Sequence, residues 1–63
     1  MKDSIVEHYK TKTSMIVPRT NGGYRVVLID SYFDIQKEVF TETLGLAELY
    51  SKTWLGKDND EIL

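Results

Sequence analysis

One stretch of the sequence decides the fold: Val17-Pro18-Arg19-Thr20-Asn21-Gly22-Gly23-Tyr24-Arg25-Val26-Val27-Leu28-Ile29-Asp30. Asn21 and Gly22 readily adopt the positive φ angles of a tight two-residue turn, and apolar, β-branched runs flank them. The stretch therefore predicts a β-hairpin with its turn at Asn21-Gly22. The hairpin sets the register of a sheet in a chain of 63 residues, a length that allows one domain at most.

The segments around this turn predict three strands. We expect the first over Thr13–Val17, the second over Tyr24–Ile29 and the third over Ile35–Thr41. The third segment has a helical alternative, in which Asp30 or Ser31 would be the N-cap. The strand is favoured because β-leaning residues run directly into the start of another helix.

A helix is predicted from Thr43 to Leu55, with Thr41 or Thr43 as its N-cap and Gly56 as its stop. The predicted fold is therefore α+β, a three-stranded antiparallel sheet with this C-terminal helix packed on one face. On a wheel of 100° per residue, the apolar face that would cover the sheet consists of Leu44, Leu46, Ala47, Tyr50, Trp54 and Leu55.

The two ends of the chain are predicted to be appendages of this single domain. Residues 1–12 are expected to form an N-terminal arm or a short helix, and residues 57–63 an acidic flexible tail. A strand remains the alternative for the first segment, with one face made of Ile5, Glu7, Tyr9, Thr11 and Thr13.

Size and composition favour a protein that relies on a partner. A domain of this length has marginal stability, and the absence of cysteine rules out disulfides and thiolate metal sites as braces. We therefore expect either a homodimer or binding to a larger protein. No run approaches the roughly 18 apolar residues that span a membrane, and the N-terminus lacks an apolar stretch of signal-peptide length, which predicts a cytoplasmic location.

Charge is distributed unevenly along the chain. Residues 1–29 carry five basic side chains against two acidic ones, whereas residues 30–63 carry three against eight. An acidic surface can steer a basic partner, or occupy the nucleic-acid channel of an enzyme by imitating phosphate charge. The alternative is that both sets are ordinary solvated charges.

Side chains that could carry chemistry are few. His8 is the only histidine, and a catalytic role would need a nucleophile and an orienting acid held beside it. Asp30, Asp34 and Glu38 are oxygen ligands, but their spacing is not that of a calcium loop. We therefore expect no enzyme activity, no metal and no cofactor.

A protein-binding site is the stronger expectation. Tyr32 and Phe33 lie in a predicted loop, and Leu49 falls among the polar positions of the helix, so the apolar pattern leaves all three outside the core. Aromatics that a fold leaves exposed are typical interface anchors. In the alternative, the two aromatics fold back under the sheet. The predicted protein-binding site consists of Asp30, Tyr32, Phe33, Asp34, Glu38 and Leu49.

These features predict a small non-catalytic binding protein that inhibits or regulates a larger protein. The alternative is a regulator that binds DNA through a basic hairpin, where cations would contact phosphates and an aromatic ring would stack on a base. The residues of that alternative nucleic-acid site are Lys10, Lys12, Arg19, Tyr24 and Arg25.

The element order from Ser14 to Lys57 resembles the strand-strand-strand-helix unit of HicB-type antitoxins. The resemblance covers about two-thirds of the chain and is carried by two segments, Gly22-Gly23-Tyr24-Arg25-Val26-Val27, and Val39-Phe40-Thr41 leading into Leu44-Gly45-Leu46-Ala47-Glu48-Leu49. The chain lacks the proline-glycine-cysteine loop of that family. The same order resembles the arm-binding domain of lambda-type integrases, which is far more basic.

In size and build the chain is also similar to small phage-encoded inhibitors of host enzymes, such as anti-CRISPR proteins. Together these resemblances imply a fold and a binding role, and they carry over no catalytic residue.

Overall fold

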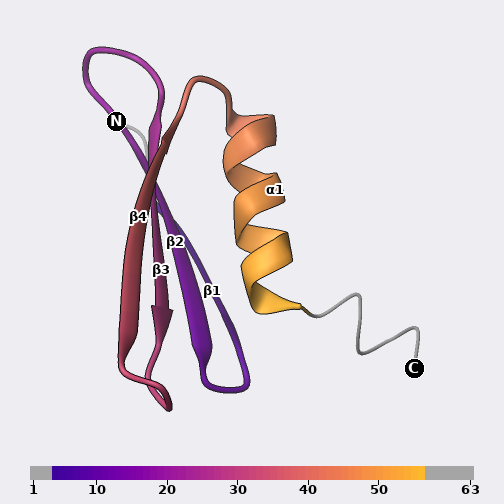
Figure 1. Cartoon of the computed structure of the whole chain (residues 1–63). Coiled ribbons are helices and arrows are strands. Elements are labelled where there is room, and N and C mark those ends of the chain that lie inside the picture. Colours follow the sequence, from indigo (N-terminus) through magenta and orange to yellow (C-terminus); the bar gives the residue numbers. More distant parts are fainter. Residues whose placement is uncertain (1–3, 57–63) are drawn as a thin grey trace.

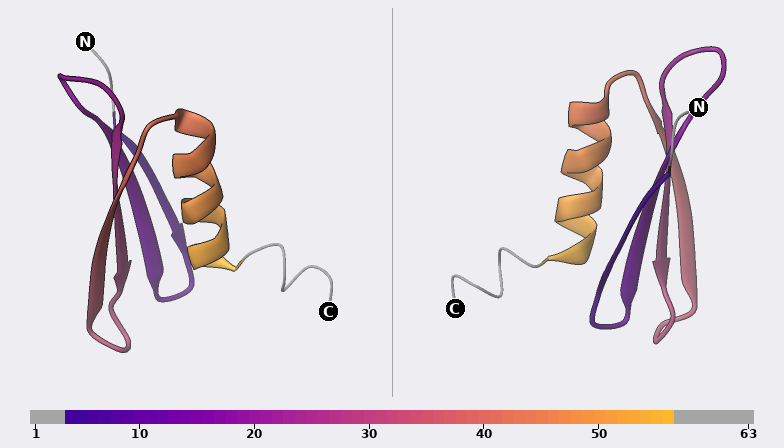
Figure 2. Two further views of the ribbon diagram at one scale, coloured as in Figure 1. Left: turned by 45° about the horizontal axis from the view of Figure 1, so that its top comes forward. Right: turned by 180° about the vertical axis from the view of Figure 1, so that it is seen from behind.

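The computed structural model describes residues 4–56, which form a four-stranded antiparallel sheet and one helix (Figure 1). The strands follow one another across the sheet in chain order. The helix covers one face of the sheet and leaves the other face open (Figure 2). The elements are β1 (Ile5–Tyr9), β2 (Lys12–Pro18), β3 (Tyr24–Asp30), β4 (Ile35–Thr41) and α1 (Leu44–Leu55).

The α+β class and the C-terminal helix are confirmed, but the predicted three-stranded sheet is wrong. Residues Ile5–Tyr9, expected in an arm or short helix, form the edge strand β1. It pairs antiparallel with β2, and Tyr9 lies opposite Lys12. In the tight turn between these strands Lys10 has a φ of 57°. Lysine seldom adopts this left-handed conformation, so the turn chemistry gave no signal for the hairpin.

The hairpin of β2 and β3 is confirmed, although its turn differs from the prediction. The N–H of Arg19 donates to the carbonyl of Gly23 (3.0 Å), and the N–H of Gly22 donates to the carbonyl of Arg19 (3.3 Å). The positive φ angles belong to Gly22 and Gly23, at 100° and 80°, and not to Asn21. The loop is therefore the longer hairpin type, in which a glycine takes the left-handed position after a turn.

The core lies between α1 and the helix-facing side of the sheet, with β3 at its centre. In β2 and β3 every second side chain points towards the helix, as the period of a strand requires. The indole N–H of Trp54 donates to the carbonyl of Ile29 (3.1 Å), which ties the end of the helix to β3. The buried cluster consists of Ile16, Val26, Leu28 and Ala47, with Tyr24, Val39 and Trp54 packed against it.

The helix face that meets the sheet differs in part from the predicted apolar face. Its buried side chains are Ala47, Ser51 and Leu55. The Ser51 hydroxyl hydrogen-bonds the Ser14 hydroxyl of β2 and also donates to the Glu7 carboxylate (3.4 Å). Because this stripe packs on the sheet, three residues predicted to cover it are partly exposed instead: Leu44 (37%), Leu46 (47%) and Tyr50 (45%).

The predicted ends of the helix are confirmed. The Thr43 hydroxyl accepts a hydrogen bond from the N–H of Leu46 (3.2 Å), and Gly56 closes the helix in the left-handed conformation with a φ of 71°. The strand predicted over Ile35–Thr41 is β4, so its helical alternative is wrong. The acidic tail predicted for residues 57–63 lies outside the described residues. Within residues 4–56, no helix has the length and apolar character needed to span a membrane.

Candidate functional site

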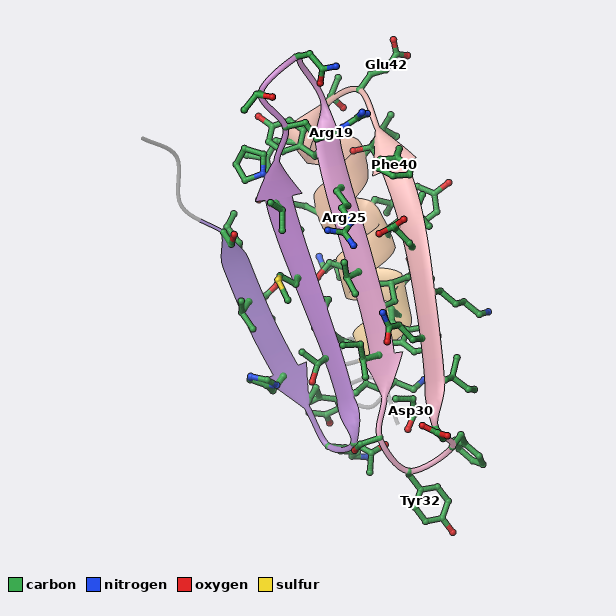
Figure 3. The ribbon with its side chains drawn as sticks, turned by 90° about the vertical axis from the view of Figure 1, so that its left-hand side faces the viewer. Arg19, Arg25, Asp30, Tyr32, Phe40 and Glu42 are labelled. Atoms are coloured by element: carbon green, nitrogen blue, oxygen red, sulfur yellow. The ribbon has the colours of Figure 1, made fainter. Side chains whose placement is uncertain are left out.

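Two aromatic rings project from one end of the sheet. Tyr32 and Phe33 lie in the turn that joins β3 to β4 and are 74% and 66% exposed. Figure 3 shows the Tyr32 ring extending beyond the last residues of the strands. The two rings pack edge to face, with centroids 4.9 Å apart. We call this pair the aromatic tip. The alternative in which these rings fold back under the sheet is wrong.

A buried carboxylate holds the backbone of the aromatic tip. Asp30, the last residue of β3, is 2% exposed. Its Oδ1 accepts hydrogen bonds from the N–H of Tyr32 (3.0 Å) and the N–H of Phe33 (3.3 Å). The Thr11 hydroxyl donates to the same oxygen (3.0 Å). Asp30 therefore fixes the start of the turn rather than presenting its charge to a partner.

The turn that carries the tip is also bonded to the neighbouring turn. The N–H and the hydroxyl of Ser31 both donate to the carbonyl of Thr11, at 3.0 and 3.2 Å. Thr11 belongs to the turn between β1 and β2, which lies at the same end of the sheet (Figure 1). A loop held by several hydrogen bonds loses less entropy on binding, so this arrangement preorganises the two rings.

The electrostatics of Asp30 favour its charged form. Burial raises the pKa of Asp30, but the hydrogen bonds from Phe33, Thr11 and Tyr32 and the nearby charge of Lys12 all lower it. The balance holds the pKa of Asp30 below its ordinary value of 3.8. The carboxylate therefore stabilises the folded state above that value, and this contribution is lost as the pH falls through the lower, folded-state pKa.

We expect the Asp30→Asn variant to be less stable than the wild type at pH 7 and less sensitive to acid. Asparagine keeps an acceptor oxygen but loses the charge that strengthens the three hydrogen bonds. Thermal melts between pH 7 and about pH 2 would show a shallower loss of melting temperature below about pH 4. Asp34→Asn removes the same unit of charge from the same turn and controls for net charge. Equal acid slopes for the wild type and Asp30→Asn would contradict this role.

Of the remaining residues of the predicted protein-binding site, Asp34 lies beside the tip, whereas Glu38 and Leu49 lie elsewhere. Asp34 lies in the same turn, with a φ of 56°. Glu38 faces the open side of the sheet, where its carboxylate pairs with the Arg25 guanidinium. Leu49 lies on α1 and is 59% exposed. Of the three predicted acids, Asp34 is therefore the one that accompanies the tip as an exposed charge.

The residues of the predicted nucleic-acid site are also spread over the molecule. Lys10 lies in the β1–β2 turn, and Lys12 faces the helix, with its Nζ 5.0 Å from the Trp54 ring centroid. Arg19 follows β2 and so lies at the opposite end of the sheet from Lys10. Its guanidinium carbon Cζ lies 4.8 Å from the centroid of the Phe40 ring (Figure 3). Tyr24 packs against the core, and Arg25 pairs with Glu38 on the open face. These side chains do not form a continuous basic patch.

Sequence reasoning missed two further exposed apolar surfaces. On the open face of the sheet, Phe40 is 56% exposed (Figure 3), and Val6, which the strand register places on the same face, is 49% exposed. A shallow hollow of about 390 Å³ lies beside Phe40, where the hairpin loop meets the end of β4. On the helix, Leu46 and Tyr50 join Leu49 on the side away from the sheet. The position of Leu49 was the one signal in the sequence for this helix surface.

Two observations on residues 4–56 concern side chains that could carry chemistry. His8 Nδ1 lies 2.8 Å from the Thr13 hydroxyl in an exposed pair. Within the described part of the chain, no three histidine or acidic side chains come together as metal ligands would. Comparisons of the chain with known protein families, with curated proteins and with solved structures found no match.

Proposed function

We propose that this protein is a non-catalytic binding protein whose aromatic tip docks on a larger protein and thereby inhibits or regulates it. The observation that carries the proposal is the preorganised, exposed pair of rings at one end of the sheet. Large exposed aromatics on a fixed backbone are typical of interface anchors, because they bury much area at little entropic cost.

The charges around the tip suit a partner with a basic rim. Asp34 is exposed beside Phe33, and a charge at the edge of an interface acts on orientation and on the rate of association more than on affinity. The small size, similar to that of phage-encoded inhibitors, and the order of β2 to α1, which resembles the strand-strand-strand-helix unit of HicB-type antitoxins, favour the same class of function.

We expect the double variant Tyr32→Ser, Phe33→Ser to lose partner binding while keeping its fold. Removing both anchors should weaken binding by at least about 30-fold, which corresponds to about 2 kcal/mol. The measurement is capture from a lysate of the cells that encode the chain, followed by titration of the captured protein. Phe40→Ser, which removes an exposed ring from the open face of the sheet, is the matched control.

Two outcomes would contradict the proposal. The first is equal capture by the wild type and the tip variant. The second is salt-dependent binding of duplex DNA by the wild type without any captured protein, which would favour the nucleic-acid alternative.

A further inference from the structure

Within residues 4–56, two strands have a side that no other strand covers. The strand order β1-β2-β3-β4 leaves β1 and β4 unpaired along their outer sides, and Figure 3 shows them at the two sides of the sheet. An unpaired edge presents backbone N–H and C=O groups that can pair with a further strand. Neither strand contains proline, and the register of each with its neighbour runs without a bulge. Both edges are therefore open to pairing.

The register identifies the backbone groups that face outward on β1. In an antiparallel pair, the N–H and C=O groups of successive residues point alternately towards the partner strand and away from it. Tyr9 and Lys12 face each other across a two-residue turn, so the backbone groups of Tyr9 point towards β2. Those of Val6 and His8 therefore point away from the sheet.

The same alternation applies to β4. The N–H of Ser31 donates to the carbonyl of Thr11, so the backbone of Ser31 is turned towards the β1–β2 hairpin. The next residue back, Asp30, is turned towards β4 and pairs with Ile35. The backbone groups of Gln36, one residue further along β4, therefore point away from the sheet, and so do those of every second residue after it.

Glu7 and Lys37 lie on the same side of the sheet, one at each edge. The Ser51 hydroxyl of α1 donates to the Glu7 carboxylate, and the ammonium of Lys37 lies 5.7 Å from the Trp54 ring centroid, so both side chains are on the helix side. Within residues 4–56 the structure gives neither side chain an oppositely charged partner. The helix side of β1 is therefore acidic at its centre, and that of β4 is basic.

Antiparallel pairing of β1 with β4 of a second copy brings complementary side chains together. In the register that places Glu7 opposite Lys37, Ile5 lies opposite Val39. Ile5 is 40% exposed and would gain an apolar neighbour. Opposite charges and apolar side chains that face each other stabilise a pair of strands. The same register sets the outward backbone groups of the two edges against each other.

Pairing between two like edges is less complementary. Two β4 strands in full antiparallel overlap place Glu38 of one copy opposite Glu38 of the other, and two β1 strands place Glu7 opposite Glu7. Like charges directly opposite each other destabilise a strand pair. Shifting the two β1 strands to avoid this contact leaves Glu7 opposite the apolar Ile5. The charges therefore favour the unlike edge of a second copy.

We propose that copies of this protein associate head to tail, with β1 of one copy antiparallel to β4 of the next. The contact joins two different surfaces, so it does not close into a two-fold dimer and can continue to longer oligomers. It covers a single strand of each copy, and the association is therefore weak. The aromatic tip takes no part in the strand pairing, so the inference is independent of the function proposed above.

Sedimentation of the full chain over a concentration series tests the association. The wild type should pass from its monomer mass of 7.3 kDa to more than twice that mass as the concentration rises. Val6→Pro and Gln36→Pro each remove an outward N–H from one edge and should weaken association at least about tenfold. Val6→Thr and Gln36→Thr keep the N–H and are the matched controls, which should associate like the wild type.

A mixture of the two proline variants tests which edges meet. Val6→Pro keeps an intact β4 edge, and Gln36→Pro keeps an intact β1 edge, so one contact remains available between the two chains. The mixture should therefore form a dimer and nothing longer, whereas each variant alone stays monomeric at the same concentration.

A charge exchange tests the register. Glu7→Lys or Lys37→Glu alone places like charges opposite each other and should weaken association about threefold. The double variant Glu7→Lys, Lys37→Glu restores opposite charges and should associate like the wild type. Thermal melts establish that each variant is folded, and if a proline variant does not fold, the charge exchange decides alone.

Three results would overturn the proposal. One is a wild type that stays monomeric to millimolar concentration. Another is association that is equally strong in the proline and the threonine variants, which would place the contact away from the edges. The third is a double charge variant that associates no better than the single variants, or a mixture of folded proline variants that stays monomeric.

Discussion

Replacing Trp54 with alanine should lower the free energy of unfolding by about 3 kcal/mol. The indole is half-buried, packs against the core cluster and donates its N–H to the carbonyl of Ile29. The ammonium groups of Lys12 and Lys37 lie 5.0 and 5.7 Å from its ring centroid. The total free energy of unfolding of a domain of 63 residues is roughly 3–9 kcal/mol. The variant should therefore melt far below the wild type or be largely unfolded.

Trp54→Phe is the matched variant for this prediction. Phenylalanine keeps much of the apolar area but lacks the N–H that donates to the carbonyl of Ile29. Trp54→Phe should therefore lower the free energy of unfolding by about 1 kcal/mol. Thermal and urea unfolding followed by circular dichroism would measure both variants. A melting temperature for Trp54→Ala within a few degrees of the wild type would show that the indole is not part of the cooperative core.

The Gly23→Ala variant should be the most damaging of the glycine substitutions. A Cβ at this position would lie 2.7 Å from the carbonyl oxygen of Thr41, a backbone atom that cannot rotate away. The φ of 80° adds left-handed strain of about 1–2 kcal/mol for any side chain. The clash and the strain together should lower the free energy of unfolding by more than about 2 kcal/mol. The clash should also push the start of β3 away from the end of β4.

Two other glycines separate the clash from the strain. Gly22 has a φ of 100°, but a Cβ added there would meet no atom within 4 Å. The loss of unfolding free energy in Gly22→Ala should therefore come from the backbone strain alone. Gly45 lies within α1 with open space around it, so Gly45→Ala should raise stability by about 0.5–1 kcal/mol. Equal losses for Gly22→Ala and Gly23→Ala, measured by urea unfolding, would show that the close approach to Thr41 has no energetic weight.

The elements predicted correctly are those whose signals are local. The hairpin of β2 and β3, the strand Ile35–Thr41 and the caps at Thr43 and Gly56 all follow from residue types next to the element they define. Strand β1 could not be separated from a helix in the same way. Its identity depends on pairing with β2 through a turn in which Lys10 takes an unusual conformation.

The candidate site was predictable in part for the same reason. Tyr32 and Phe33 were expected outside the core because they interrupt the apolar pattern, and both are exposed. The position of Asp30 depends on Thr11, which is 19 residues away in the sequence and which no local pattern connects to it. The rotation of α1 likewise depends on a contact between Ser14 and Ser51, so the helical wheel placed Ala47, Trp54 and Leu55 correctly but also included Leu44, Leu46 and Tyr50, which are exposed.

The order of the strands has a consequence for how fast the chain folds. Because β1 to β4 are neighbours both in the sheet and in the sequence, every strand pairing closes a short loop. The longest closure is the docking of α1, which brings Ser51 to Ser14 across 37 residues and to Glu7 across 44. Pairing between elements that are adjacent in sequence costs less loop-closure entropy than pairing between distant ones, which favours faster folding. The meander can therefore form hairpin by hairpin, and the return of the helix is the step that completes the native state.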